Sequence, residues 1–236
     1  MENSSWRQFS RTLSVILFGV LVFAGATQAQ VVSRSKEIVV VTPTSLPTLA
    51  QEPGIAFQLY SEAGDGSAYL YIEQNQGERL LVLDVTDPAH VKMVGAVTLT
   101  VPGPFEFVRT IGSSAFLISF RNNLGGAVLD LRKPKAPTLK AVPNLHDVGR
   151  SEPIGDSAFL IPDGGNMDRQ AAPRDYQVLD TSNPADPSLL FTVKQVTSKL
   201  ERNETGTTFL LGHDGLTIIR RPQVEYRYKS EQGYGT

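Results

Sequence analysis

Leu80-Leu81-Val82-Leu83-Asp84-Val85-Thr86-Asp87-Pro88 is an apolar run that ends in an aspartate and, four positions later, a proline. Aliphatic and β-branched residues of this kind favour a β-strand, whereas proline stops one because its nitrogen has no hydrogen to donate. The same spacing recurs at residues 127–134 and 177–184, and a degenerate copy at 216–222 has arginine where the aspartate should be. The chain therefore contains a repeated unit.

The aspartates that end these runs have a structural interpretation. An aspartate side chain can accept hydrogen bonds from the backbone N–H groups of the turn that follows it. Catalytic groups, in contrast, are seldom repeated in the same position around a fold. We therefore interpret Asp84, Asp130 and Asp180 as residues that hold turns, and not as catalytic carboxylates.

A short strand with an aromatic residue precedes each of these runs. A glycine stands shortly before each strand, as a tight hairpin turn requires. Strand-forming residues also dominate the neighbouring segments, so each unit is predicted to hold an inner strand, the aromatic strand, the aspartate strand and an outer strand after the proline. The aromatic residues, whose strands are expected to supply the core between units, are Tyr69, Phe116, Phe159 and Phe209, and the glycines are Gly66, Gly112, Gly155 and Gly206.

Tandem units of about 40 to 50 residues, each with four short strands, are typical of the blades of a β-propeller. A single four-stranded blade cannot bury both of its faces, but stacked blades can cover one another. We predict an all-β fold, a β-propeller of four four-stranded blades. This is either a closed four-bladed ring or half of a larger ring.

The segment 80–88, together with Ala-His-Val-Lys-Met-Val-Gly-Ala at 89–96, resembles the LVIVD repeat of exported bacterial and archaeal β-propeller proteins. The resemblance extends over residues 55–222 and is strongest in the first copy. It implies a propeller fold and a role at the cell surface or outside the cell. The family offers no agreed catalytic residues to carry over, and its members usually have more copies than the four found here.

Two β-rich segments outside the repeats bear on how such a ring closes. Residues 37–42 lie upstream of the first unit, and residues 224–228 alternate strictly and are expected to form a last strand. Either segment can pair with the opposite end of the chain or with a neighbour, because an unpaired strand edge invites association. We expect intramolecular closure into four blades, and the alternative is a half-ring completed by a second copy as a homodimer.

The first residues have the pattern of an export signal. Arg7 and Arg11 precede an apolar run at 13–24, and small residues follow it up to Ala29. This is the order of a cleavable signal peptide, and the run is shorter than the roughly 20 residues of a membrane span. We predict a periplasmic or extracellular protein without a membrane span after cleavage; an uncleaved N-terminal anchor is the alternative. The predicted organisation is a signal peptide at 1–29, a linker with a closing strand at 30–53, a propeller domain at 54–229 with units at about 54–100, 101–145, 146–198 and 199–229, and a tail at 230–236.

Composition excludes several classes of function. The chain of 236 residues contains no cysteine and has a formal net charge of -2, which rules out thiol chemistry and argues against a nucleic-acid partner. His90, His146 and His213 stand in or beside predicted turns without a metal-binding spacing. The stretch 163–168, inside an insertion at 162–175, resembles a calcium loop in composition only, because its oxygen ligands do not alternate. We expect no metal and no cofactor.

Three arginines stand shortly before the aromatic strands, and they are expected on or near the innermost strands that surround the channel of a propeller. Guanidinium groups there can hold an anionic ligand or a carboxylate of a partner. The alternative is that they pair with Glu106, Glu152 and Glu201, stabilise the channel rim and bind nothing. The candidate ligand-binding residues are Arg109, Arg150 and Arg202.

No catalytic motif accompanies the repeats. A nucleophile elbow, a phosphate-binding loop and a dinucleotide fingerprint are all missing from the sequence. We therefore predict that the protein is not an enzyme but a binding module, which presents its loops to an unknown protein or glycan at the cell envelope. The alternatives are a propeller hydrolase or lactonase, which would need converging carboxylates or histidines, and a half-propeller structural subunit that assembles with another copy.

Overall fold

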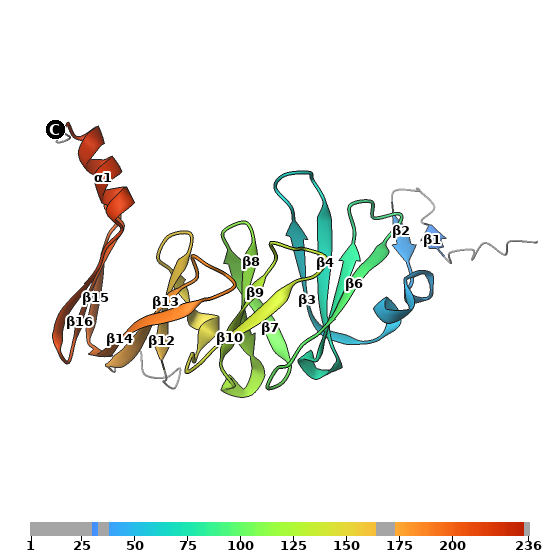
Figure 1. Ribbon diagram of the computed structural model, residues 1–236, viewed down its shortest axis with the longest axis horizontal. Helices are drawn as coiled ribbons and strands as arrows, with labels where there is room; N and C mark the ends of the chain where they lie inside the picture. The colour runs from blue at the N-terminus through green and yellow to red at the C-terminus, as the bar shows by residue number, and fades with distance from the viewer. Residues whose placement is uncertain (1–29, 33–37, 164–172, 234–236) are drawn as a thin grey trace, which may run out of the picture.

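The computed structural model describes residues 30–32, 38–163 and 173–233. Within them, four small antiparallel sheets follow one another along the chain and stand side by side in a row (Figure 1). In each sheet, strands that are consecutive in sequence are hydrogen-bonded neighbours. The predicted signal peptide at 1–29 lies outside the described residues.

The first two sheets have four strands each, in the predicted order of a first strand, an aromatic strand, an aspartate strand and an outer strand. Short 3-10 turns with left-handed residues connect the two middle strands of both sheets. The first sheet contains β3 (Gly54–Ser61), β4 (Ala68–Gln74), β5 (Arg79–Asp84) and β6 (Lys92–Thr98), and the second contains β7 (Phe105–Ile111), β8 (Ala115–Phe120), β9 (Gly126–Asp130) and β10 (Thr138–Val142).

The last two sheets each depart from the regular pattern at one edge strand. The third begins with a strand of only two residues, and the fourth has three strands among the described residues. The prediction of four strands in every unit is therefore wrong for the fourth unit. The third sheet contains β11 (Glu152–Pro153), β12 (Ala158–Asp163), β13 (Arg174–Asp180) and β14 (Ser188–Val196), and the fourth contains β15 (Ser198–Arg202), β16 (Thr207–Gly212) and β17 (Gly215–Ile219).

The segment before the first sheet is short and partly extended. The strand predicted at 37–42 is present as β2 (Val39–Val41), which pairs antiparallel with β1 (Gln30–Val32). The residues that follow, expected to be a linker, form two 3-10 turns, η1 (Pro43–Ser45) and η2 (Thr48–Gln51).

A helix, α1 (Pro222–Glu231), replaces the final strand predicted at 224–228. Proline at the first helical position has its backbone angle preset for a helix, and Arg220 forms an ion pair with Glu225 in the first turn. The alternating tyrosines that suggested a strand do not share a buried face, since Tyr226 is 74% exposed. Local helix signals therefore outweighed a two-residue period here.

Three apolar clusters hold neighbouring sheets together. The first, between the first and second sheets, includes Tyr71 and Phe116; the second, between the second and third, includes Leu117 and Phe159. The third, between the third and fourth, includes Leu210. Burial between sheets is thus the main source of stability, as expected for units that cannot cover their own faces.

The repeated aromatic residues do not all face the same way. Phe116 and Phe159 pack towards the preceding sheet, whereas Tyr69 packs towards the following one. The fourth, Phe209, belongs to none of the three clusters, and its neighbour Leu210 takes the buried position. The register of strand pairing explains why Tyr69 and Phe116 face opposite ways. In the first sheet Tyr69 pairs with Asp84, whereas in the second sheet Ala115, one residue before Phe116, pairs with Asp130. A shift of one residue turns a strand's side chains to the other face.

Candidate functional site

The repeated aspartates hold turns, as predicted. The Oδ1 atom accepts a hydrogen bond from the backbone N–H two residues later, at 3.0 Å in Asp84, 2.9 Å in Asp130 and 2.8 Å in Asp180. Hydrogen bonds from Thr86 lower the pKa of the Asp84 carboxyl, which keeps it ionised. These carboxylates are therefore engaged in local structure.

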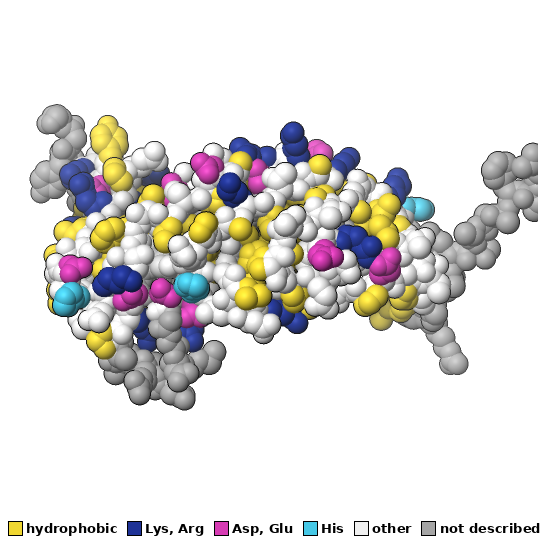
Figure 2. All heavy atoms as spheres, turned by 60° about the horizontal axis from the view of Figure 1, so that its bottom comes forward, with side chains coloured by type: hydrophobic (Ala, Val, Ile, Leu, Met, Phe, Trp, Pro, Cys, Tyr) yellow, Lys and Arg dark blue, Asp and Glu magenta, His cyan; other side chains and the backbone are white. Residues whose placement is uncertain are grey.

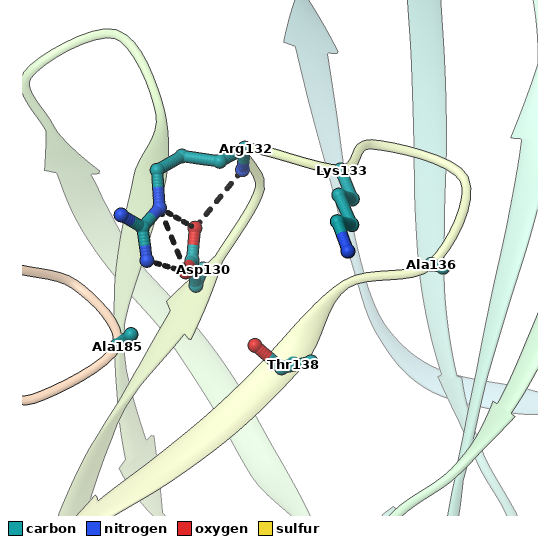
Figure 3. A pocket seen from close by; sticks show the side chains of 6 residues that line it. All are labelled: Asp130, Arg132, Lys133, Ala136, Thr138 and Ala185. Carbon is teal, nitrogen blue, oxygen red and sulfur yellow. Dashed lines mark hydrogen bonds and ion pairs between the residues drawn. The ribbon is translucent and has the colours of Figure 1, made fainter.

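Asp130 has a further partner and lines a cavity of about 440 Å³ (Figure 3). Its carboxylate is held in a forked arrangement by Arg132, with Nη2 2.6 Å from Oδ2 and Nε 3.0 Å from both oxygens. Burial acts to raise the pKa of Asp130, but the hydrogen bonds from Arg132 outweigh it and lower the pKa. Because the Arg132 charge is matched inside the protein, this cavity is a weak candidate for an anion site.

Replacing Asp130 by alanine is expected to lower the free energy of unfolding by about 1–2 kcal/mol, because the turn loses its acceptor and Arg132 its partner. Asparagine keeps the acceptor without the charge and should cost less. The folded-state pKa lies below the ordinary 3.8, so the ionised carboxylate stabilises the protein above that pH and the benefit disappears as the pH falls through the folded value. Urea unfolding of both variants at several pH values measures this; an equal cost for both would contradict the turn role.

The structure places the three predicted arginines in three different surroundings. Arg109 lies on β7, and its guanidinium carbon is 5.8 Å from the centre of the Phe159 ring in the next sheet. Its Nε atom is buried without a hydrogen-bond partner. Arg109 thus lies between the second and third sheets, where its flat guanidinium packs on an aromatic face.

Arg150 lies at the end of a 3-10 turn, η5 (Val148–Arg150), just before β11. It lines a second cavity of about 440 Å³ with Arg121 and Asp147. The Arg121 side chain is held by Glu106, with Nη2 3.0 Å from Oε1. Two guanidinium groups and the Asp147 carboxylate therefore line this cavity, and the Glu106 carboxylate lies nearby.

Arg202 ends β15 and lines a smaller cavity of about 170 Å³ between the third and fourth sheets. The side chain is flanked by the Tyr228 ring, 5.5 Å away, and by Glu204, whose Oε2 is 3.7 Å from Nε. A second arginine, Arg221, lines the same cavity together with Glu201 and several backbone groups. This cavity combines one of the predicted residues with Arg221, whose side chain has no hydrogen bond or ion pair among the described residues.

Glycines make room for Arg221. A Cβ atom at Gly155 would lie 2.6 Å from its Nη2 atom, and one at Gly206 would lie 2.9 Å from its Cδ. Both glycines also have positive φ angles, in the hairpin turns of the third and fourth sheets. The Arg221 side chain therefore packs closely against the backbone of both turns.

The predicted glutamate partners pair with other residues. Glu152 forms an ion pair with Lys199, whose Nζ atom is also 3.0 Å from Glu201. Among the described residues, the ion pairs of Glu106, Glu152 and Glu201 are thus with Arg121 and Lys199. Sequence reasoning missed Lys199 and Arg221, although Arg221 stands directly before Pro222, where the repeat pattern is broken.

The histidines agree with their prediction as turn residues. His90 and His213 are exposed and His146 is half-buried. The Nδ1 atom of His90 lies 2.7 Å from Oδ2 of Asp87 on the same turn. Among the described residues, no three histidine or acidic side chains form a group that could hold a metal ion. Most of the stretch 163–168 lies outside the described residues.

A row of sheets built from repeated strand pairs and aspartate turns, with basic cavities at the junctions, defines a β-rich repeat protein. Comparison with known families also finds a repeat, because the LVIVD repeat matches residues 67–99 and 174–195. These ranges contain β4 to β6 of the first sheet and much of β13 and β14 of the third. The chain therefore contains two segments that match the LVIVD repeat. No curated protein matches it. Within the described part of the chain, no helix is long and apolar enough to cross a membrane.

Proposed function

We propose that this LVIVD-repeat protein is a non-catalytic binding module of the cell envelope, periplasmic or extracellular, whose four sheets are the blades of a propeller. The site proposed for its ligand is the cavity of Arg202 and Arg221, and the ligand is an anionic group of a protein or glycan. A non-catalytic role is supported by the aspartates that the repeats share, because these residues hold turns. The observation that carries the proposal is the half-buried Arg221, which has no ion pair among the described residues and lines a cavity together with Arg202.

The geometry of the cavity suits a small anion. Two guanidinium groups can grip one carboxylate, sulfate or phosphate group through several N–H donors at once. Thr207 and Thr208 also line the cavity, and their chain segments bring further polar groups to it. Glu201 disfavours a second negative charge nearby, but Lys199 lies 3.0 Å from it and offsets that charge. The site is therefore expected to select one compact anionic group at a time.

The distribution of charge on one face of the molecule is consistent with a local site. On the face shown in Figure 2, basic and acidic side chains are interspersed among apolar ones instead of forming one large basic patch. An extended polyanion is held by many basic groups together, whereas a single group can be held by two. Recognition through one cavity is consistent with this distribution.

Sulfate and polygalacturonate, an anionic glycan, are suitable probes for calorimetric titration at constant ionic strength. The wild-type protein should bind both, and a double variant with Arg202→Ala and Arg221→Ala should bind at least tenfold more weakly, because a charged hydrogen-bonded contact contributes about 1.5–3 kcal/mol. Arg227→Ala, an exposed site on α1 outside the cavity lining, is the matched control and should bind as the wild type does. Absence of binding to the wild type, or equal binding by the double variant, would overturn the proposal.

A further inference from the structure

The two ends of the row of sheets each expose an apolar face. At the C-terminal end, the outward side of the fourth sheet carries two rows of paired residues: Leu200, Phe209 and Ile218 in one, and Leu211 and Leu216 in the other. Four of these side chains are 49–63% exposed. On the opposite side of the same sheet, Leu210 is fully buried against the third sheet. The described residues therefore cover only one face of the fourth sheet.

The first sheet has the corresponding exposed side at the other end. Phe57 and Leu59 alternate with residues that pack inwards, and they are 73% and 53% exposed. Their cross-strand partners, Ile72 and Leu70, lie on the same side and are half-buried. Large side chains exposed next to one another on a strand usually mark a surface that another molecule covers.

Each exposed face continues the packing seen inside the row. In the second and third sheets, the side that faces the preceding sheet is filled by Phe116 and Phe159, and Phe57 and Leu59 lie on the equivalent side of the first sheet. The outward side of the fourth sheet is the side that, in the second and third sheets, packs on the following sheet. The last face therefore matches the first face as one internal sheet matches the next.

The positions of the first and fourth sheets indicate what can cover the two exposed faces. In Figure 1 the first sheet and the fourth sheet lie at opposite ends of the row, with α1 above the fourth and β2 beside the first. A last face that fits a first face can therefore be covered by the first face of another molecule. We propose that two copies associate head to tail, the fourth sheet of each packing on the first sheet of the other, to close one ring of eight sheets.

This inference rests on the blade arrangement of the proposed function, but not on the anion site. Head-to-tail contacts use two different surfaces, so they form a closed ring only if the rotation between copies closes, and a ring of eight blades is within the range of known propellers.

Two double variants test the arrangement in the chain without residues 1–29. One carries Phe57→Asp and Leu59→Asp on the first face, and the other carries Leu200→Asp and Ile218→Asp on the last face. Because these positions are exposed, both variants should fold, which circular dichroism verifies. Light scattering should give twice the chain mass for the wild type and the single-chain mass for each variant alone. An equimolar mixture of the two variants should form a one-to-one dimer, since one intact junction remains.

The other outcomes overturn the inference in distinguishable ways. A monomeric wild type indicates closure within one chain, and a wild type that grows into larger species indicates an open polymer. A dimer that survives only one of the two double variants indicates a symmetric contact between like faces. None of these results tests the anion site. Anion binding by the Arg202→Ala, Arg221→Ala double variant is measured by titration, which can be done in whichever assembly forms.

Discussion

Replacing Phe116 by alanine is expected to lower the free energy of unfolding by about 3–5 kcal/mol. The ring is 1% exposed and lies at the centre of the contact between the first two sheets. Its centroid is 6.2 Å from those of Tyr60 and Tyr71 and 5.7 Å from that of Phe107, with the rings close to perpendicular. Alanine removes all three edge-to-face contacts and leaves a cavity that β-strands fixed by their ladders cannot collapse to fill. For a domain with a total stability of about 5–15 kcal/mol, this is a large fraction.

Phe191→Ala is the matched control for that variant. The chemical change is the same, but Phe191 is 59% exposed on β14 and belongs to none of the three clusters, so the cost should stay within about 0.5 kcal/mol. Urea unfolding followed by far-ultraviolet circular dichroism measures both. If Phe116→Ala costs no more than Phe191→Ala, the first two sheets do not depend on this aromatic cluster and the description of the core is wrong.

The sequence predicts the order of strands well because the relevant signals are local. An apolar run ended by Asp and Pro, or a strand preceded by Gly, needs no knowledge of distant contacts. Which face each strand buries is a different matter. Tyr69 and Phe116 occupy the same place in the sequence pattern, yet they face one another across one junction because the first sheet pairs with a register shifted by one residue. Repeat alignment alone does not contain that shift.

The candidate site was predicted only in part for a related reason. Arg109, Arg150 and Arg202 stand at similar distances before an aromatic residue, but the turns between differ in length. Arg109 and Arg150 lie in different surroundings near the junction of the second and third sheets, and Arg202 lies between the third and fourth. Arg221 was missed since its role depends on two glycine turns from different sheets meeting at one place. Spacing along the chain locates a residue on its strand, whereas a cavity depends on how strands from different units meet.

One charged residue lies on the buried face of its strand, two positions after the buried Tyr71. Glu73 on β4 is fully buried, and neither of its carboxylate oxygens has a hydrogen-bond partner of good geometry. Burial raises the pKa of this carboxyl, and the nearby backbone N–H groups of Ile55 and Gly77 offset the rise only in part. Arg121 is the charged side chain that acts on it in the same direction as these N–H groups. Glu73 therefore carries a cost in the folded protein whenever it is ionised.

Replacing Glu73 by glutamine is expected to raise the free energy of unfolding at neutral pH by about 1–3 kcal/mol, because the amide avoids burying a charge while its oxygen still faces the same N–H groups. The sign of the pH dependence follows from the raised pKa. Below the ordinary value of 4.5 the carboxyl is protonated in both the folded and unfolded states, so wild type and variant should differ little. As the pH rises through the raised folded-state pKa, the wild type loses stability that the variant keeps, and the difference should grow and then level off.

Glu106→Gln distinguishes this effect from a general response to losing a carboxylate. Glu106 is exposed and pairs with Arg121, so its replacement should change stability by no more than about 1 kcal/mol, in the destabilising direction. The lowered pKa values of Asp84 and Asp130 make the whole protein less stable in acid, but they are common to wild type and variants and cancel in the difference. A Glu73→Gln variant that is less stable than the wild type at neutral pH would mean that the ionised carboxylate is held by the surrounding N–H groups after all, and that this carboxylate stabilises the bulge of β3 beside it.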